Sequence, residues 1–273
     1  MKRLELPNNK VNKFEIWLNK NCNFNCLYCG VHDNFFKDPE PDYNKIASYF
    51  PYIEKDAFIT ILGGEPTLSK HLEPLVNFLK NNGFTNINIY SNFNKPKIIQ
   101  GVKYLVTYHP DQTDIKTFLN NVKEHKDKIR FMMIMWDSKN DKKIQTEFKI
   151  LKSLFPGTSL EPTYQIDSKG NMQKDNFNKF QELGLTKYSK LLTLKNEYLG
   201  YSYIEILNNS WNTLPKKCNI KNEIIIFDVV TNERYNCCTE SGMKRKYNTE
   251  IQYNDGYCIT ECSLNLEHLV EIK

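Results

Sequence analysis

The sequence predicts an α/β fold in which a parallel sheet forms an open or partial barrel with helices packed on its outside. Strand-like and helix-like patterns alternate over roughly the first 165 residues, and such alternation is typical of parallel sheets. The pattern changes after about residue 176, where a cysteine-rich region follows. We therefore expect one large α/β unit and a small C-terminal unit of α+β structure.

Six segments have the apolar, β-branched and aromatic character of strands. They are Lys13–Asn19, Ala57–Leu62, Asn86–Ser91, Lys103–His109, Ile129–Trp136 and Ser159–Thr163. Helices are predicted between them at Tyr43–Phe50, Lys70–Asn82, Thr113–His125 and Asp141–Phe155. These units predict a partial (β/α)6 barrel, in which the chemistry gathers on the loops after the carboxyl ends of the strands.

The C-terminal region has a less regular pattern. Lys174–Lys195 is predicted to be helical in two pieces around Gly184, and short strands are predicted at Tyr201–Ile206 and Glu223–Val230. We place the division between the two units at residue 195. Residues 1–195 then form the core domain and residues 196–273 the C-terminal domain.

Composition excludes several classes of protein. The net charge of +5, from 37 basic and 32 acidic residues, is smaller than a dedicated nucleic-acid binder needs. The N-terminal segment has no apolar run that resembles a signal peptide, and no window approaches the ~18 apolar residues of a membrane span. We expect a cytoplasmic protein without a membrane anchor. Its 8 cysteines are then better explained as metal or cluster ligands than as disulfides.

Three of these cysteines form a compact loop just after the first predicted strand. Cys22, Cys26 and Cys29 have the spacing C-x3-C-x2-C. A structural zinc ion takes four protein ligands, so zinc would need a distant residue or His32 as well. A [4Fe–4S] cluster on three thiolates instead keeps one iron open to a substrate or cofactor, and Tyr28 with its apolar neighbours could shield it.

Two further predicted strands end in recognisable motifs. Gly63-Gly64-Glu65-Pro66 ends the second strand, and Ser91-Asn92 ends the third. Together with the cysteine loop and the aromatic residue before its last cysteine, these motifs resemble the radical S-adenosylmethionine (radical SAM) superfamily. The resemblance covers roughly residues 13–165 in order and architecture. Phe93 departs from it, because glycine is common at that position and would allow a positive φ.

The resemblance implies a cofactor and a reaction. Cys22, Cys26 and Cys29 would hold a [4Fe–4S] cluster, and S-adenosylmethionine would bind its open iron. An electron from a flavodoxin- or ferredoxin-type donor would cleave S-adenosylmethionine reductively to a 5′-deoxyadenosyl radical, which abstracts hydrogen from the substrate. The resemblance also implies a set of cofactor-binding residues. These are Tyr28, Gly63, Gly64, Glu65 and Pro66, which would border the cofactor and receive its ammonium group, and Ser91 and Asn92 near its ribose.

Five more cysteines fall near the C-terminus. Their arrangement resembles the twitch or SPASM auxiliary-cluster domain, which implies a second [4Fe–4S] cluster. The ligands would be Cys218, Cys237, Cys258 and Cys262. A four-cysteine zinc site would fit the same residues. Cys238 could replace Cys237 as a ligand, could be a small buried residue, or could donate a hydrogen atom as in radical epimerases.

Other candidate catalytic residues end the fourth and sixth predicted strands. Tyr108 and His109 precede Pro110, and Glu161 and Tyr164 lie near the end of the sixth strand. Loops at these positions line the cavity of such folds, so we expect substrate contacts there. The alternative for His109 is a structural role, in which a histidine in a turn makes its hydrogen bonds to nearby groups and does not contact the substrate.

Three substrate classes remain open: a small molecule, a peptide, and a nucleotide or nucleic acid. About a dozen residues precede the first strand, and no RNA-binding module follows the last cysteine. We therefore expect no leader-peptide-binding domain, and a small-molecule or peptide substrate rather than nucleic acid. A non-catalytic metal-binding protein is a further alternative, which the complete cysteine triad and glycine motif disfavour.

Overall fold

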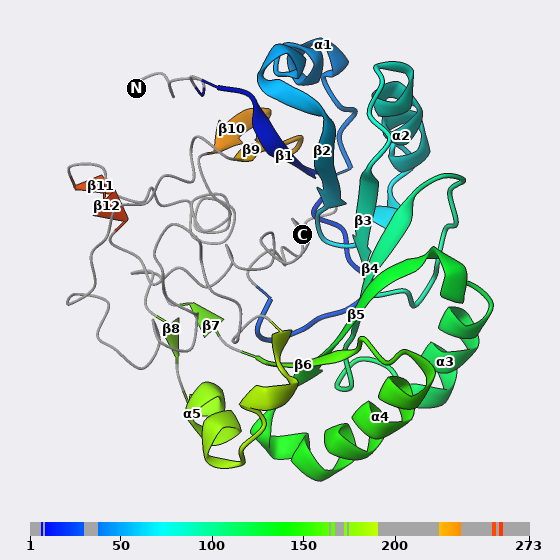
Figure 1. The fold of residues 1–273 in the computed structure, drawn as a ribbon, viewed down its shortest axis with the longest axis vertical. Coiled ribbons are helices and arrows are strands. Elements are labelled where there is room, and N and C mark those ends of the chain that lie inside the picture. The colour runs from blue at the N-terminus through cyan, green and yellow to red at the C-terminus, as the bar shows by residue number, and fades with distance from the viewer. Residues whose placement is uncertain are drawn as a thin grey trace.

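The main feature of the computed structural model is an eight-stranded sheet in the order β10-β9-β1-β2-β3-β4-β5-β6 (Figure 1). The structure describes residues 7, 9–29, 38–163, 165–166, 172–173, 175–190, 224–235, 253–254 and 257–258. The strands β1 to β6 are each parallel to the next, in chain order. This winding is that of a partial (β/α) barrel, which confirms the predicted fold class.

The six predicted strands are all present, with small shifts at their ends. Their bounds are β1 Val11–Trp17, β2 Ile53–Leu62, β3 Ile87–Ser91, β4 Lys103–Tyr108, β5 Ile129–Trp136 and β6 Ser159–Pro162. β2 is longer than predicted because it begins at Ile53, where it pairs with Val11 of β1. The carboxyl ends of all six strands lie at one edge of the sheet.

The helices follow the prediction but are shorter. They are α1 Tyr43–Ala47, α2 Leu72–Asn81, α3 Ile115–Lys123, α4 Asp141–Leu154 and α5 Asp175–Glu182. Short 3-10 turns lie at Phe50–Tyr52, Pro66–Leu68, Lys126–Lys128, Ser138–Asn140 and Thr186–Tyr188. Residues 92–102, all described, join β3 to β4 without a helix. No described helix combines the length and the apolar character needed to span a bilayer.

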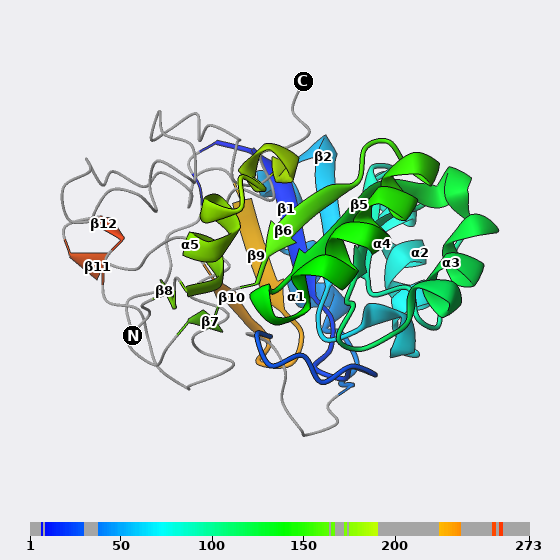
Figure 2. The same ribbon diagram turned by 90° about the horizontal axis from the view of Figure 1, so that it is seen from below.

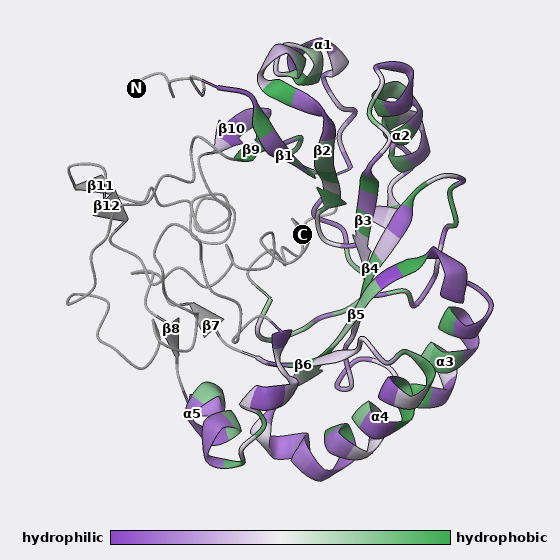
Figure 3. Ribbon diagram, viewed as in Figure 1, coloured by the Kyte–Doolittle hydropathy of each residue, from purple (hydrophilic) through white to green (hydrophobic). Residues whose placement is uncertain are grey.

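The helices α1 to α4 cover the convex face of the curved sheet (Figure 1), and α2, α3 and α4 lie together on one side in the second view (Figure 2). Their apolar sides turn toward the strands and their hydrophilic sides turn outward (Figure 3). Phe14 and Ile16 of β1 belong to the same buried cluster as Leu75, Phe118 and Leu151 of the helices. Burial of this layer is the main stabilising contribution to the fold.

The concave face of the sheet is more polar. Glu15 of β1 is paired in register with Thr60 of β2, and Thr60 with Asn88 of β3. All three side chains are buried. Because side chains alternate along a strand, these residues face away from the helices. Sequence reasoning did not single out this row, since each residue lies inside an otherwise apolar strand.

The hairpin β9 (Ile224–Asp228) and β10 (Glu233–Tyr235) extends the main sheet. β9 is parallel to β1, and β10 is antiparallel to β9. Asn232 supplies the left-handed residue of the turn, with φ +55°, where no glycine is available. This strand was predicted within the C-terminal domain, yet it pairs with the first strand of the core. The division at residue 195 remains a prediction.

Two other pairs of short strands are described. β7 (Gln165–Ile166) pairs with β8 (Met172–Gln173), and β11 (Tyr253–Asn254) with β12 (Tyr257–Cys258). The predicted strand at Tyr201–Ile206 and the helical segment beyond residue 190 lie outside the described residues.

Candidate active site

Four loops meet at the carboxyl edge of the sheet. They are the cysteine loop after β1 (residues 19–29), the Gly-Gly-Glu-Pro loop after β2 (63–66), the loop after β3 (92–94) and the loop after β4 (109–113). Chemistry gathers at this edge in barrels built from parallel strands. The contacts described below join these loops to one another.

The Gly-Gly-Glu-Pro loop lies directly against the cysteine loop. The Gly64 amide donates to the Asn19 carbonyl at 3.0 Å, and the Glu65 amide donates to the Asn21 carbonyl at 2.5 Å. The Asn19 side-chain amide returns a bond to the Glu65 carbonyl at 3.0 Å. A Cβ atom on Gly63 would lie 2.6 Å from the Asn19 carbonyl oxygen, and one on Gly64 would lie 2.6 Å from the Asn21 carbonyl carbon. The glycines are therefore required by the close approach of another backbone segment.

Glu65 joins the loops after β2 and β3. Its buried carboxylate accepts hydrogen bonds from the Thr67 hydroxyl at 2.6 Å and the Thr67 amide at 3.1 Å. It also accepts from the Ser91 hydroxyl at 2.9 Å and the Asn92 amide at 2.7 Å. Burial raises the pKa of the Glu65 carboxyl, and these donors oppose that shift. Both carboxylate oxygens are thus engaged within the protein, while a contact of this loop with a cofactor remains a prediction.

The loop after β3 contacts the first cysteine. The Asn92 side-chain amide donates to Asn23 Oδ1 at 2.8 Å and lies 3.8 Å from Cys22 Sγ. Phe93 adopts φ +55° and is fully buried, and its amide donates to Ser91 Oγ at 2.9 Å. The turn that glycine would favour is therefore formed by phenylalanine, at a cost of roughly 1–2 kcal/mol in backbone strain. Recognition of a ribose by Ser91 and Asn92 remains a prediction.

The thiols of the cysteine loop are shielded from solvent to different degrees. Cys26 is buried, while Cys22 and Cys29 are half-buried. The Phe24 amide donates to Cys22 Sγ at 3.4 Å. Burial raises the pKa of the Cys22 thiol to about 11 and that of the Cys26 thiol to about 12. In the metal-free protein these thiols are protonated at neutral pH, so metal binding must displace their protons.

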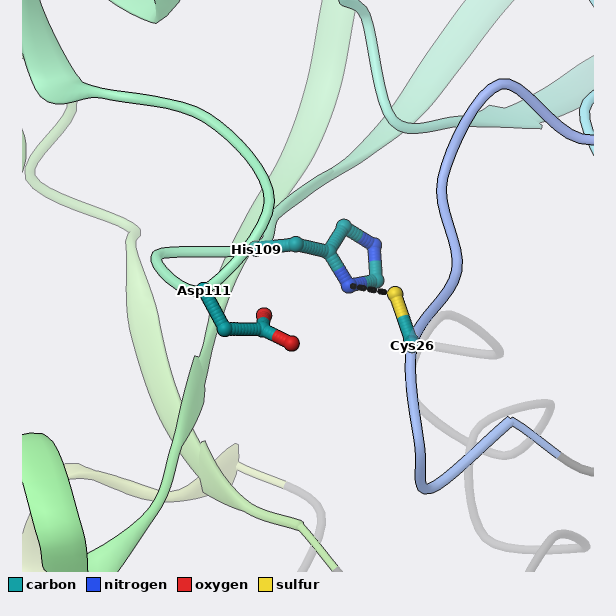
Figure 4. A group of neighbouring side chains, drawn as sticks. All are labelled: Cys26, His109 and Asp111. Atoms are coloured by element: carbon teal, nitrogen blue, oxygen red, sulfur yellow. Dashed lines mark hydrogen bonds between the residues drawn. The ribbon is translucent and has the colours of Figure 1, made fainter.

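His109, at the start of the loop after β4, faces the cysteine loop (Figure 4). Its Nδ1 atom lies 3.5 Å from Cys26 Sγ and 2.8 Å from the Tyr28 hydroxyl. The Tyr28 hydroxyl donates to Asp111 Oδ1 at 3.3 Å. Burial lowers the pKa of His109 to about 4, so its imidazole is neutral at physiological pH. The structure therefore brings three predicted site residues, Cys26, Tyr28 and His109, together.

Gln112 holds the cysteine loop from the same side. Its side-chain oxygen accepts from the Asn25 amide at 2.9 Å, and its side-chain amide donates to Asp111 Oδ2 at 2.8 Å. Sequence reasoning missed both Asp111 and Gln112. The available signal was their position, because they follow His109 and Pro110 directly at the end of a strand.

Tyr108 and Glu161 are not brought to the cysteine loop. Alternation along β4 places Tyr108 on the face opposite His109. There its ring packs on Phe118 of α3, and its hydroxyl donates to Glu147 of α4 at 3.1 Å. Glu161 is buried, and its carboxylate accepts from the Ser189 hydroxyl and from the Lys190 amide. Catalytic roles for these two residues remain predictions.

Some predicted site residues cannot be placed. His32, Tyr164, Cys218, Cys237, Cys238 and Cys262 lie outside the described residues, and for Cys258 only the strand assignment in β12 is described.

The donor atoms of the cysteine loop discriminate between a single ion and a cluster. Around one zinc ion, Zn–S distances of about 2.3 Å bring the ligand sulfurs within roughly 4 Å of one another. Among the described residues, Cys26, His109 and Asp111 are the one group of three His, Cys, Asp or Glu residues whose donor atoms all lie within 4.8 Å of one another. Cys22 and Cys29 are not part of that group. The three thiols therefore do not all lie within 4.8 Å of one another, which fits a cluster, because each cysteine then binds a different iron atom.

Comparison with known proteins relates the fold to solved structures that contain bound S-adenosylmethionine (AdoMet). No protein-family model and no curated protein matches the chain. Among solved structures, anSMEcpe with bound AdoMet matches with a TM-score of 0.53 at 14% identity, over 83% of this chain and 71% of that one. A complex of anSMEcpe with AdoMet and the Cp18Cys peptide matches with a TM-score of 0.52 at 12% identity, over 95% and 80%.

A third match is SuiB from Streptococcus suis bound to S-adenosylmethionine, with a TM-score of 0.48 at 13% identity. It covers 84% of this chain and 58% of that one, so this chain spans less than two thirds of SuiB. The likeness to anSMEcpe extends over the sheet whose strand ends carry the three motifs. The chain therefore shares its fold with a protein whose structure contains bound AdoMet, and the barrel architecture that the sequence predicted is confirmed.

Proposed function

We propose that this chain is a radical SAM enzyme in which Cys22, Cys26 and Cys29 hold a [4Fe–4S] cluster with one iron open to S-adenosylmethionine. Cluster and S-adenosylmethionine together supply a 5′-deoxyadenosyl radical that abstracts hydrogen from the substrate. The observation that carries the proposal is the position of the cysteine loop. It lies at the carboxyl edge of a parallel barrel sheet, in contact with the loops after β2, β3 and β4.

The residues of the chain hold the ligand sulfurs in place. Asn92 and the Phe24 amide contact Cys22, and His109 contacts Cys26. Hydrogen bonds of this kind stabilise iron-bound thiolates and tune the potential of a cluster. We place S-adenosylmethionine against the cysteine and glycine loops, with Tyr28 beside it and Ser91 near its ribose.

A peptide is the substrate class that we favour. One matched structure of anSMEcpe contains the Cp18Cys peptide, and its fold likeness covers 95% of this chain. A small molecule is the alternative within the same chemistry, and base modification of a nucleotide is a third. A true substrate would increase the yield of 5′-deoxyadenosine and acquire a change of mass, so peptide, metabolite and nucleotide pools can be compared in one assay.

We also propose that the C-terminal cysteines bind a second [4Fe–4S] cluster. The candidate ligands are Cys218, Cys237, Cys258 and Cys262, with Cys238 as a substitute for Cys237. A reduced, cytoplasmic location and a flavodoxin- or ferredoxin-type donor belong to the same proposal, because free thiols and a strong reductant are required. Counting iron, sulfide and zinc after anaerobic reconstitution distinguishes two clusters from one cluster with zinc.

The central experiment is cleavage of S-adenosylmethionine by the reconstituted protein. With dithionite as reductant, the wild-type protein should form 5′-deoxyadenosine and methionine. Cys26→Ala should form neither product and should lose the iron of the first cluster. Ser153→Ala is the matched control, since it removes one polar side-chain atom from an exposed position on α4, and it should retain the iron and form both products. An iron-free wild-type protein with intact thiols would refute the proposal.

One observation favours a second candidate, a single metal ion at Cys26, His109 and Asp111. Their donor atoms lie within 4.8 Å of one another. Such an ion would use one cysteine of the loop and leave the other two out. Cys22→Ala would then retain zinc, whereas His109→Ala would lose it. The cluster proposal predicts the opposite: Cys22→Ala loses the bound metal and His109→Ala retains it, because Cys22 is a ligand and His109 is not.

A further inference from the structure

The Tyr28 hydroxyl contacts two polar groups of the loop after β4. It donates its proton to Asp111 Oδ1 at 3.3 Å and lies 2.8 Å from His109 Nδ1. A phenol carries a single proton, and an ionised carboxylate can only accept one. The phenol proton is therefore assigned to Asp111, so that in the short contact Nδ1–H donates to the phenol oxygen. With this assignment, Asp111 and Tyr28 together select the Nδ1–H tautomer of the imidazole.

The same Nδ1 atom lies 3.5 Å from Cys26 Sγ (Figure 4). Two aromatic rings hold the imidazole in this orientation. Phe24 meets it edge-on at 5.6 Å between ring centroids, and Tyr28 lies almost parallel to it at 6.1 Å. With the tautomer and the ring plane both fixed, the Nδ1–H group is shared between the phenol oxygen and the sulfur of a cysteine ligand.

We propose that His109 is a positioning residue that donates an N–H···S hydrogen bond to the iron-bound Cys26 thiolate and thereby raises the reduction potential of the cluster. The inference rests on the proposed function, because it requires a cluster at Cys26. The reduced cluster carries one more negative charge than the oxidised cluster. A hydrogen bond to one of its sulfurs therefore stabilises the reduced form more strongly.

The test is a redox titration, monitored by electron paramagnetic resonance, of the anaerobically reconstituted protein without S-adenosylmethionine. His109→Phe keeps an aromatic ring but removes the donor. At a fixed potential it should show about a tenfold lower ratio of reduced to oxidised cluster, which corresponds to about 59 mV for one electron. His109→Asn retains an amide donor near the position of Nδ1 and should restore most of the potential. Tyr52→Phe, in the 3-10 turn that precedes β2 at the opposite edge of the sheet, should leave the potential unchanged.

Tyr28→Phe provides an independent measurement, because it removes the acceptor that fixes the tautomer but keeps the aromatic ring. It should shift the potential in the same direction by a smaller amount. In the wild-type protein, hyperfine spectra of the reduced cluster should show a histidine nitrogen that His109→Phe removes. Iron content is measured first for every variant. Should His109→Phe assemble no cluster, the potential of Tyr28→Phe tests the inference in its place.

Two results would overturn the inference, and they are distinguishable. If wild-type protein and both variants hold full clusters with equal potentials, the hydrogen bond is absent but the proposed function stands. If the wild-type protein assembles no cluster at all, the proposed function and this inference fail together.

Discussion

Replacement of Gly64 by alanine tests why the Gly-Gly-Glu-Pro motif contains glycine. A Cβ atom at this position would lie 2.6 Å from the Asn21 carbonyl carbon and 2.6 Å from the Lys20 carbonyl oxygen. Ordinary contact between such atoms begins near 3.5 Å, so the two loops must separate by about 1 Å. Both atoms belong to the backbone, and no side-chain rotation can relieve the overlap. Gly64→Ala must therefore displace the cysteine loop.

The cost can be worked out from the bonds that this separation breaks. The two loops are joined by the amide of Gly64 to Asn19, the amide of Glu65 to Asn21, and the Asn19 side chain to the Glu65 carbonyl. Each such bond contributes roughly 0.5–1.5 kcal/mol net, so their loss should lower the free energy of unfolding by about 3 kcal/mol. Urea denaturation of the metal-free protein measures this change directly.

Two other glycines provide matched controls for Gly64→Ala. Gly157→Ala should be neutral, because its nearest neighbour would be the Lys190 Nζ atom at 3.8 Å. Gly184→Ala should cost only about 1 kcal/mol, because Gly184 has a φ of +64° but no atom within 4 Å of the added Cβ. If Gly64→Ala is no less stable than Gly184→Ala, yet loses affinity for S-adenosylmethionine, the glycine serves the ligand and the packing argument is refuted.

Three further changes have clear expected outcomes. Phe93→Ala should lower the free energy of unfolding by about 3–5 kcal/mol, because a buried ring is lost. Phe93→Gly should be about 1 kcal/mol more stable than the alanine variant, because glycine adopts the φ of +55° without strain. Equal urea midpoints of the two variants would show that the backbone is not strained there. In the β9–β10 turn, Asn232→Ala should lower the free energy of unfolding by about 1 kcal/mol and Asn232→Gly should not lower it, because φ is +55° there as well. Thermal unfolding measures both changes. Burial raises the pKa of the Glu147 carboxyl in the folded protein. The folded state therefore binds a proton more tightly than the unfolded chain does. This contribution to stability is complete below the ordinary pKa of 4.5 and is lost as the pH rises through the folded pKa. Glu147→Gln should therefore gain stability relative to wild type at pH 7, and this gain should vanish near pH 4; a gain that is equal at both pH values would contradict this.

The core strands could be predicted because their signals are local. Segments such as Ile129–Trp136 and Lys103–Tyr108 carry enough apolar and β-branched residues to identify them without their neighbours. The pairing of Ile224–Asp228 with β1 could not be predicted in the same way. That contact joins segments about 200 residues apart, and the strand pattern alone does not determine the partner. The segment is a strand, as predicted, but its pattern gave no indication that its partner is β1.

In the candidate site, too, local features could be predicted from the sequence and non-local contacts could not. The cysteine spacing and the Gly-Gly-Glu-Pro motif are local signals, and the structure joins the two loops that carry them by backbone hydrogen bonds. The choice between Tyr108 and His109 was not available from the sequence, because both are plausible on either face of a strand. The helices decide it: α3 and α4 provide apolar and polar partners for Tyr108, so His109 is turned toward the cysteine loop. The contact of Gln112 with Asn25 is equally non-local.

These contacts indicate a structural role for Glu65 of the Gly-Gly-Glu-Pro motif, whereas the sequence suggested a role in cofactor binding. A carboxylate beside a cofactor site is expected to bind the cofactor, yet Glu65 is engaged by four donors from its own loop and the next. Its backbone amide holds the cysteine loop at the same time. A buried carboxylate of this kind stabilises the relative position of three loops, because each bond would leave an unpaired buried donor if the loops separated. The thiols of the cysteine loop are therefore positioned by groups distant in sequence. If the proposed function holds, the polar atoms of this motif that remain for a cofactor are backbone atoms.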